Sequence, residues 1–140
     1  MDTTAWKLRN RIKLQFKSAG YSITLSAKNN RLFCCSLQDA VIHIYSLSGE
    51  LLQTHGKPGH RAAGRLCSPY ICKTGDADDD GSVLIVDLHN NRLQVMNERG
   101  KFRVLHLEPP VLQPRSAVLF NNFLYVVSLD NTIFKYSLSS

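Results

Sequence analysis

Two short stretches of the chain carry side chains that could bind a charged partner. One is glycine-rich and basic and runs over residues 56–69, and the other is polar and runs over 89–92. Lysine and arginine attract phosphates or acidic groups, whereas asparagine and histidine can hydrogen-bond to unstacked bases. The candidates are Lys57, His60, Arg61, Arg65, His89, Asn90, Asn91 and Arg92. Two other interpretations stay open, which are solvated loop charges without a partner and a purely structural role for Arg92.

An acidic run gives a second candidate site. Residues 76–81, DADDDG, have the D-x-D-x-D-G spacing of a calcium loop, in which spaced carboxylates converge on a turn. The calcium candidates are Asp76, Asp78, Asp80 and Asp87, the last of which falls where a twelfth ligand would lie. We favour an exposed acidic hairpin, because the apolar residues 84–86 must pack in a sheet and no flanking helices are predicted. We therefore predict no metal and no cofactor.

No motif in the sequence indicates an enzyme. The five histidines at positions 43, 55, 60, 89 and 106 show no metal-binding spacing, and no nucleophile elbow or phosphate-binding loop occurs. The four cysteines form no CxxC pair, which favours free thiols in a reducing compartment. These patterns predict a protein without catalytic activity.

Length and composition are those of one globular domain. The chain has 140 residues, of which 44% are hydrophobic and 20% charged, and its formal net charge is +6. No uncharged apolar run approaches the roughly 18 residues of a membrane span. Basic residues interrupt the N-terminal region, unlike the apolar core of a secretory signal. We expect a soluble cytoplasmic protein whose basic surface could attract RNA or acidic proteins.

Three copies of one pattern run along the chain. Residues 29–49 align without a gap on residues 80–100, at a displacement of 51, and residues 121–140 form a third copy. Each copy has a continuous apolar run, a short polar loop and an alternating run, which predicts two antiparallel strands. Another strand precedes each pair, and a fourth follows the first two pairs. Four antiparallel strands recurring about every 40–50 residues predict the blades of a β-propeller.

The whole chain is therefore expected to be one all-β domain, a partial β-propeller of about three four-stranded antiparallel blades. Residues 1–20 are expected to supply an N-terminal strand, because the alternation in Arg11–Phe16 favours a strand over a helix. Blade 1 would cover residues 21–66, and blade 2 would cover residues 67–113. An incomplete blade 3 would cover residues 114–140.

Three blades cannot close a ring, because propellers have about four to eight. The sequence is either a piece of a longer chain, which we favour, or a half-ring that forms a six-bladed homodimer. In the homodimer, the N-terminal strand would clasp the partner and cover an open sheet edge. Propeller geometry places the linker before a blade on the same rim as the loop between its second and third strands. The eight basic and amide candidates are therefore expected to form one binding rim.

The middle copy resembles an NHL repeat. Residues 56–69, GKPGHRAAGRLCSP, are similar to the glycine-rich linker of these repeats. Residues 80–102, DGSVLIVDLHNNRLQVMNERGKF, are similar to their core, in which a D-G turn leads to an apolar strand, Asp and Asn-Arg. The resemblance extends over about residues 21–140. The third copy lacks the glycine linker, and the first has Ala40 and Val41 in place of Asn-Arg.

This resemblance implies a module that is commonly the terminal part of tripartite-motif ubiquitin ligases and recruits proteins or single-stranded RNA. Our leading hypothesis is a non-enzymatic module that recruits protein partners, such as ubiquitin-ligase substrates. Single-stranded RNA binding through the basic rim is the first alternative. The second is a propeller enzyme of the amidating-lyase type, whose metal-site histidines have no recognisable counterparts in this sequence.

Overall fold

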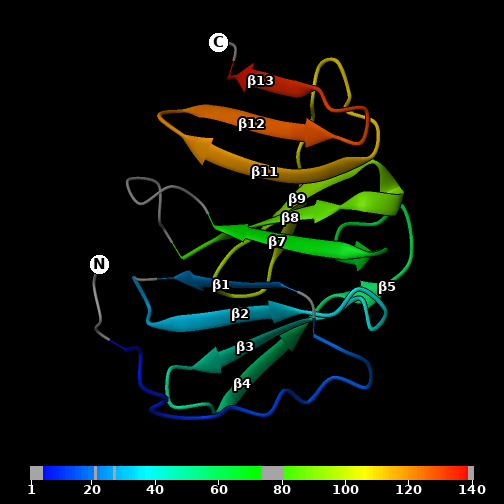
Figure 1. Cartoon of the computed structure of the whole chain (residues 1–140). Helices are drawn as coiled ribbons and strands as arrows, with labels where there is room; N and C mark the ends of the chain where they lie inside the picture. The colour runs from blue at the N-terminus through cyan, green and yellow to red at the C-terminus, as the bar shows by residue number, and fades with distance from the viewer. Residues whose placement is uncertain (1–4, 21, 27, 74–80, 139–140) are drawn as a thin grey trace.

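The structure is a computed structural model that describes residues 5–20, 22–26, 28–73 and 81–138. These residues form antiparallel sheets, and the one helix among them is the short 3₁₀ segment η2, Leu88–Asn90. Figure 1 shows the sheets side by side in chain order, with β1–β4 at one end and β11–β13 at the other. The predicted all-β class and the predicted four-stranded antiparallel sheets are confirmed.

Blades 1 and 2 each have four strands that are hydrogen-bonded in chain order. Apolar residues with branched or aromatic side chains favour these strands, and the sheet of blade 2 lies between the other two blades. All five residues of β8 are buried, as its continuous apolar run predicts. Blade 1 consists of β1 Ser22–Ser26, β2 Arg31–Cys35, β3 Ile42–Ser46 and β4 Leu51–His55. Blade 2 consists of β7 Pro69–Lys73, β8 Val83–Asp87, β9 Arg92–Met96 and β10 Phe102–Val104.

Blade 3 is a three-stranded sheet in the described residues. It consists of β11 Pro114–Phe120, β12 Phe123–Ser128 and β13 Ile133–Ser137. Strand β13 pairs with β12 alone in this part of the chain, so its outer edge carries no strand. The third sheet therefore agrees with the incomplete blade that the sequence predicts.

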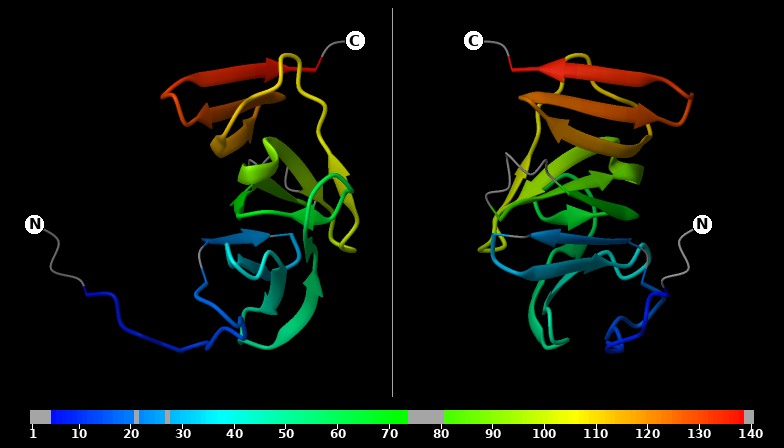
Figure 2. Two further views of the ribbon diagram at one scale, coloured as in Figure 1. Left: turned by 90° about the vertical axis from the view of Figure 1, so that its right-hand side faces the viewer. Right: turned by 60° about the vertical axis from the view of Figure 1, so that its left-hand side comes forward.

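Neighbouring blades pack face to face. We call the side of each blade that points towards the N-terminal end of the stack its first face, and the opposite side its second face. The second face of blade 1, with Phe33 and Ile44, packs on the first face of blade 2, with Ile71 and Ile85. The second face of blade 2 packs in the same way on blade 3, around Val126. Figure 2 shows the same succession of sheets from two further sides.

The linker between blades 1 and 2 makes a small sheet of its own. Strand β5 Lys57–Pro58 pairs in parallel with β6 Arg65–Leu66. Gly64 has a φ of +85°, and a Cβ atom there would lie 3.3 Å from the Phe102 ring. Glycine thus permits both the left-handed backbone and the close approach to blade 2.

The predicted N-terminal strand does not form in the structure. Residues 5–20 have no regular secondary structure, although Arg11–Phe16 alternates as a strand would. The segment pairs with no strand among the described residues. It lies instead against the first face of blade 1, where the Phe16 ring stacks on the buried His43 imidazole with centroids 4.1 Å apart. No helix among the described residues is long and apolar enough to cross a bilayer.

Candidate interaction rim

The structure brings the two predicted stretches together, and we call the eight candidate residues the binding rim. The turn formed by η2 lies against the linker between blades 1 and 2. The side-chain amide of Asn90 donates to the carbonyl of Gly59 at 3.0 Å, and Asn90 Oδ1 contacts His60 Nδ1. The backbone N–H of His89 donates to the carbonyl of Cys67 at 3.2 Å. The predicted meeting of linker and loop therefore occurs.

A buried carboxylate organises this contact. Asp87 ends β8 and is fully buried. It accepts hydrogen bonds from Cys67 N at 2.8 Å, Asn90 Nδ2 at 2.9 Å, Arg92 Nε at 2.9 Å and Gln94 Nε2 at 3.1 Å. Because a buried charge needs an ion pair and hydrogen bonds, these four donors explain how the carboxylate is tolerated.

This set of donors overturns the assignment of Asp87 as a calcium ligand. Both carboxylate oxygens already accept hydrogen bonds from the chain's own groups. The other calcium candidates, Asp76, Asp78 and Asp80, lie outside the described residues. The part of the chain that the structure describes contains no group of three or more His, Cys, Asp or Glu side chains able to hold a metal ion.

Arg92 points inward to the linker backbone. Its Nη1 donates to the carbonyl of Arg61 at 2.5 Å, and its Nη2 donates to the carbonyls of Ala62 at 3.1 Å and Arg65 at 2.9 Å. Because Nε also binds Asp87, all three nitrogen atoms of the guanidinium make hydrogen bonds within the protein. Arg92 is therefore a structural residue, as the alternative interpretation of the sequence allowed.

Sequence analysis missed Gln94. Its side chain is fully buried, accepts from Gly64 N at 3.0 Å and donates to the carbonyl of Arg65 at 3.0 Å. The signal was present, because Gln94 is a polar residue between Leu93 and Val95 in a strand that neighbouring blades cover. Buried polar side chains in such positions need hydrogen-bond partners.

Three cations of the rim remain exposed. Lys57, Arg61 and Arg65 lie on the linker with exposed side chains. The ion pairs among the described residues are Arg92–Asp87 and His106–Glu108, so these three cations have no carboxylate partner in that part of the chain. They are the rim residues best placed to meet a negatively charged partner.

The remaining rim residues are divided between structure and surface. Asn91 is exposed, but its Oδ1 accepts from Gln113 N at 2.8 Å and so helps to hold the linker into blade 3. His60 is exposed beside Asn90, and His89 is exposed with Nδ1 2.8 Å from Ser68 Oγ. A partner on the rim could therefore reach both imidazoles.

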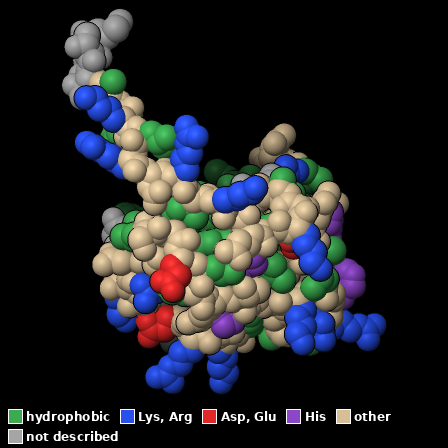
Figure 3. All heavy atoms as spheres, turned by 90° about the horizontal axis from the view of Figure 1, so that it is seen from below, with side chains coloured by type: hydrophobic (Ala, Val, Ile, Leu, Met, Phe, Trp, Pro, Cys, Tyr) green, Lys and Arg blue, Asp and Glu red, His purple; other side chains and the backbone are tan. Residues whose placement is uncertain are grey.

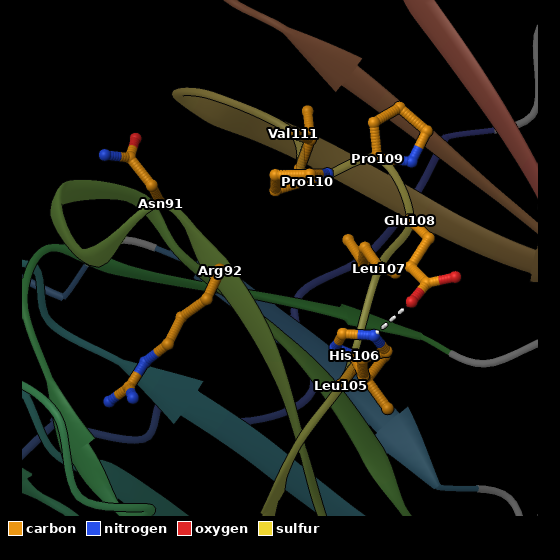
Figure 4. Close-up of a pocket in the computed structure, with 9 residues that line it drawn as sticks. All are labelled: Asn91, Arg92, Leu105, His106, Leu107, Glu108, Pro109, Pro110 and Val111. Atoms are coloured by element: carbon orange, nitrogen blue, oxygen red, sulfur yellow. Dashed lines mark hydrogen bonds and ion pairs between the residues drawn. The ribbon is translucent and has the colours of Figure 1, made fainter.

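A cavity of about 330 Å³ lies beside the rim, and sequence analysis did not predict it. Asn91 and Arg92 form one wall, and the connector from Leu105 to Val111 forms the other. Figure 4 shows Arg92 directed away from the connector and His106 paired with Glu108. His106 is thus an exposed connector residue, whereas the buried His43 lies in β3. The walls are mainly apolar, which suits shape-based contact with a partner.

The thiols near the blade cores are poorly suited to chemistry. Cys34 and Cys35 are buried and free, and Cys67 is free and half-buried. Burial raises the pKa of the Cys34 thiol to about 11, and the neighbouring Cys35 adds to this effect. A thiol with so high a pKa is protonated near neutral pH and is a weak nucleophile.

Comparison with known proteins identifies the fold and no family. No family model matches the chain, and no curated protein matches it. A virginiamycin B lyase from Staphylococcus aureus superposes with a TM-score of 0.62 and 16% identity, over 92% of this chain and 45% of the lyase. Nidogen in a nidogen–laminin complex gives 0.64 and 17%, over 85% of this chain and 43% of that one.

A third similar structure is covered over its whole length by this chain. The computationally designed Ika4 protein superposes with a TM-score of 0.60 and 11% identity, over 95% of this chain and 100% of the designed chain. The lyase and nidogen structures are β-propellers, and our chain spans less than half of each. At these identities the likeness shows the fold alone. The chain is an arc of a β-propeller.

Proposed function

We propose that this propeller arc is a non-enzymatic interaction module of the NHL type that recruits a protein partner through its binding rim. The observation that carries the proposal is the exposure of Lys57, Arg61 and Arg65 on the linker. The main chain of this linker is held by hydrogen bonds from the Arg92 guanidinium. Because the linker is already ordered, it loses less conformational entropy on binding than a loose loop would.

The charge of the rim favours an acidic protein segment. Three exposed cations attract carboxylates and steer association, and the adjoining apolar cavity supplies shape contact. Single-stranded RNA remains the first alternative, since the same cations attract phosphates. The rim has no aromatic side chain among its eight residues, whereas proteins that hold single strands commonly stack bases on aromatic rings. The protein partner is therefore the stronger proposal.

Two finer expectations belong to the same proposal. By its resemblance to NHL repeats, the module would serve in the cytoplasm and capture substrates for a ubiquitin ligase of the tripartite-motif class. The propeller found in the nidogen–laminin complex shows that this fold occurs in an assembly of proteins. Recruitment of a protein is thus compatible with the architecture.

Charge reversal on the rim tests the proposal. The triple variant K57E/R61E/R65E is titrated against a fluorescently labelled peptide of Asp and Glu residues and against labelled oligouridine, at several salt concentrations. We expect the wild-type chain to bind the peptide and the variant to bind it about tenfold more weakly or worse. The control is R99E/K101E, because these exposed charges lie at the β9–β10 turn, at the opposite end of the strands.

Each result has a defined meaning. Peptide binding that the rim variant loses and the control keeps supports protein recruitment. Salt-dependent binding of oligouridine without peptide binding supports the RNA alternative. Equal losses in both charge variants, or no binding of either probe, would show that the rim is not the working surface.

The enzyme alternative rests on the resemblance to NHL propellers, which include an amidating lyase, and His60 and His89 are the exposed histidines of the rim. An amidating-lyase activity requires a bound metal. Elemental analysis of the purified chain tests this alternative, and a stoichiometric metal retained by the wild type and lost by H60A/H89A would favour it over the interaction module.

A further inference from the structure

We propose that two copies of this chain close a six-bladed ring by exchanging N-terminal arms. We define the arm as residues 5–9. In this arrangement the arm of each copy adds a fourth strand to β13 of the other copy. The second face of each blade 3 then packs on the first face of the partner's blade 1. The inference is independent of which partner the rim binds.

The first step concerns how a chain segment enters each blade. In blade 2, the loop after β8 binds the incoming linker through His89 N and the carbonyl of Cys67, at 3.2 Å. In blade 3, the loop after β12 does the same through Leu129 N and the carbonyl of Gln113, at 3.0 Å. The loop between the second and third strands of a blade therefore holds the linker that precedes that blade.

Blade 1 holds the N-terminal segment in this way. Asp39, in the loop after β2, accepts from Lys17 N at 2.7 Å and from Ser18 Oγ at 2.5 Å. Ser18 Oγ also lies 2.8 Å from Ser36 Oγ. Residues 10–20 thus occupy the place of a linker that enters blade 1 from a preceding blade.

The lengths agree with this interpretation. Thirteen residues, 56–68, connect the outer strand β4 of blade 1 to β7. Twelve residues, 10–21, separate the arm from β1. The arm therefore lies at the point in the sequence where the outer strand of a preceding blade is expected. It pairs with no strand among the described residues.

The arm is exposed and suited to pairing. The side chains of Trp6 and Leu8 are exposed, and in an extended strand they point to the same side. Figure 2 shows the arm running away from the body of the molecule. Figure 3, a view onto the blade 1 end, shows Lys and Arg side chains along it. Trp6 and Leu8 could both become buried if the arm paired with a sheet edge.

Blade 3 offers the complementary edge and face. Among the described residues no strand pairs with the outer edge of β13, so a strand can be added there. Beside that edge, the second face of blade 3 exposes a group of large apolar side chains that no other blade covers in the described structure. They are Val118, Phe120, Val127 and Ile133.

The opposite end of the arc exposes the matching face. Ile23 and Leu25 are exposed on β1, at the first face of blade 1. A cavity of about 360 Å³ lies between this face and the N-terminal segment, and its lining includes Ile12, Leu14 and Ile23. The pair of faces that would meet is the pair that already packs between blades 1 and 2 and between blades 2 and 3.

A second copy of the chain can cover the edge and face of blade 3 and the first face of blade 1 at the same time. Within one chain the arm lies at blade 1, at the opposite end of the stack from β13, as Figure 1 shows. Two arcs of three blades give six, which falls within the range of about four to eight blades that close.

Sedimentation of the full chain over a range of concentrations tests the exchange. We expect the wild type to form a dimer and no larger species. Trp6→Asp in the arm and Ile133→Lys on blade 3 should each raise the dimer dissociation constant about tenfold or more, since each buries a charge in the junction. Leu112→Lys is the matched control, because Leu112 and Ile133 are 69% and 68% exposed and only Ile133 lies on the proposed interface.

A mixture of the two variants makes the test specific. A heterodimer of W6D with I133K keeps one intact junction, so the mixture should associate more tightly than either variant alone. Circular dichroism checks that each variant is folded. Should Ile133→Lys unfold the chain, Val127→Lys tests the same face, and Leu8→Asp replaces Trp6→Asp in the arm.

Three results would overturn the proposal. The first is a wild-type chain that stays monomeric or forms open polymers. The second is a dimer that I133K breaks and W6D leaves intact, which indicates pairing of two blade 3 faces without exchange. The third is a dimer that L112K weakens as much as I133K.

Discussion

The linkers into blades 1 and 2 occupy the same place in the fold and are held by different means. The linker into blade 2 is bound by the buried side chains of Asp87 and Gln94 together with Arg92. The segment into blade 1 is bound at the surface, by Asp39 and by the hydroxyl of Tyr45, which accepts from Gln15 N at 3.1 Å.

This difference shows how one topology can make a permanent junction and a releasable one. Breaking the buried set would leave a charge and an amide without partners, which is strongly unfavourable. Breaking the contacts of the blade 1 segment leaves no buried charge behind, because Asp39 lies at the surface, although the Tyr45 hydroxyl loses its donor and Phe16 leaves the His43 ring. We therefore expect the N-terminal segment to detach from blade 1 more easily than the other linker detaches from blade 2. Substitutions in each linker contact test this expectation.

The largest effect is expected for Asp87→Ala. Loss of the carboxylate leaves Arg92 and Gln94 without their shared acceptor, and we expect the free energy of unfolding to fall by about 3–5 kcal/mol. Urea unfolding followed by circular dichroism measures the change. The control is Asp39→Ala, which removes the equivalent acceptor of the other linker and should cost far less. Equal losses would contradict the distinction between the two linkers.

A smaller effect is expected for Tyr45→Phe. The buried hydroxyl of Tyr45 links Gln15 N to His43 Nδ1, which lies 3.2 Å away. Its loss should lower the free energy of unfolding by about 0.5–1.5 kcal/mol. It should also speed proteolytic cleavage within residues 10–18. Tyr125→Phe is the comparison, because the structure gives the Tyr125 hydroxyl no hydrogen bond among the described residues. Unchanged cleavage in Tyr45→Phe would show that this hydroxyl does not hold the segment.

The smallest effect is a local dependence on pH. Burial lowers the pKa of His43 below its usual 6.5, although Asp39 opposes the shift. A lowered folded-state pKa means that the contribution to stability is present above pH 6.5 and is lost as the pH falls below it, through the folded-state pKa. The physical reason is that the buried imidazole disfavours its charged form, and its Nδ1 lies 3.2 Å from the Tyr45 hydroxyl that holds Gln15 N.

Hydrogen exchange of residues 10–18 measures this effect. We expect protection, corrected for the intrinsic rate, to decrease between about pH 7 and about pH 5. Burial also lowers the pKa of His55, which lies on β4, so a local probe is needed to separate the two. His43→Gln should abolish the dependence, and His55→Gln should leave it. A dependence that survives in His43→Gln would assign it to another group.

Much of the fold could be predicted from the sequence because blade strands have a local signal. The apolar runs at 32–35, 83–86 and 124–127 lie in β2, β8 and β12. Among these strands β8 is buried throughout, as a strand covered on both faces should be. The convergence of the linker with residues 89–92 followed from the topology of a blade. It needed no information about individual contacts.

The rest depended on contacts between distant residues. Asp87 matched a calcium pattern by spacing, and only the fold shows that Cys67, Arg92 and Gln94 occupy its oxygens. The alternation of Arg11–Phe16 is genuine, but a strand forms only when an edge is available for pairing. Within one chain this segment lies beside a sheet face and not beside an edge.

The hydrogen bonds from Arg92 to the carbonyls of Arg61, Ala62 and Arg65 have a consequence for evolution. Their acceptors are backbone carbonyl groups, which are present whichever amino acid stands at these positions. The side chains at these three positions can therefore be exchanged with little effect on how the two blades are joined. Single substitutions at these positions can therefore change which partner the rim binds, while the backbone of the linker keeps its position.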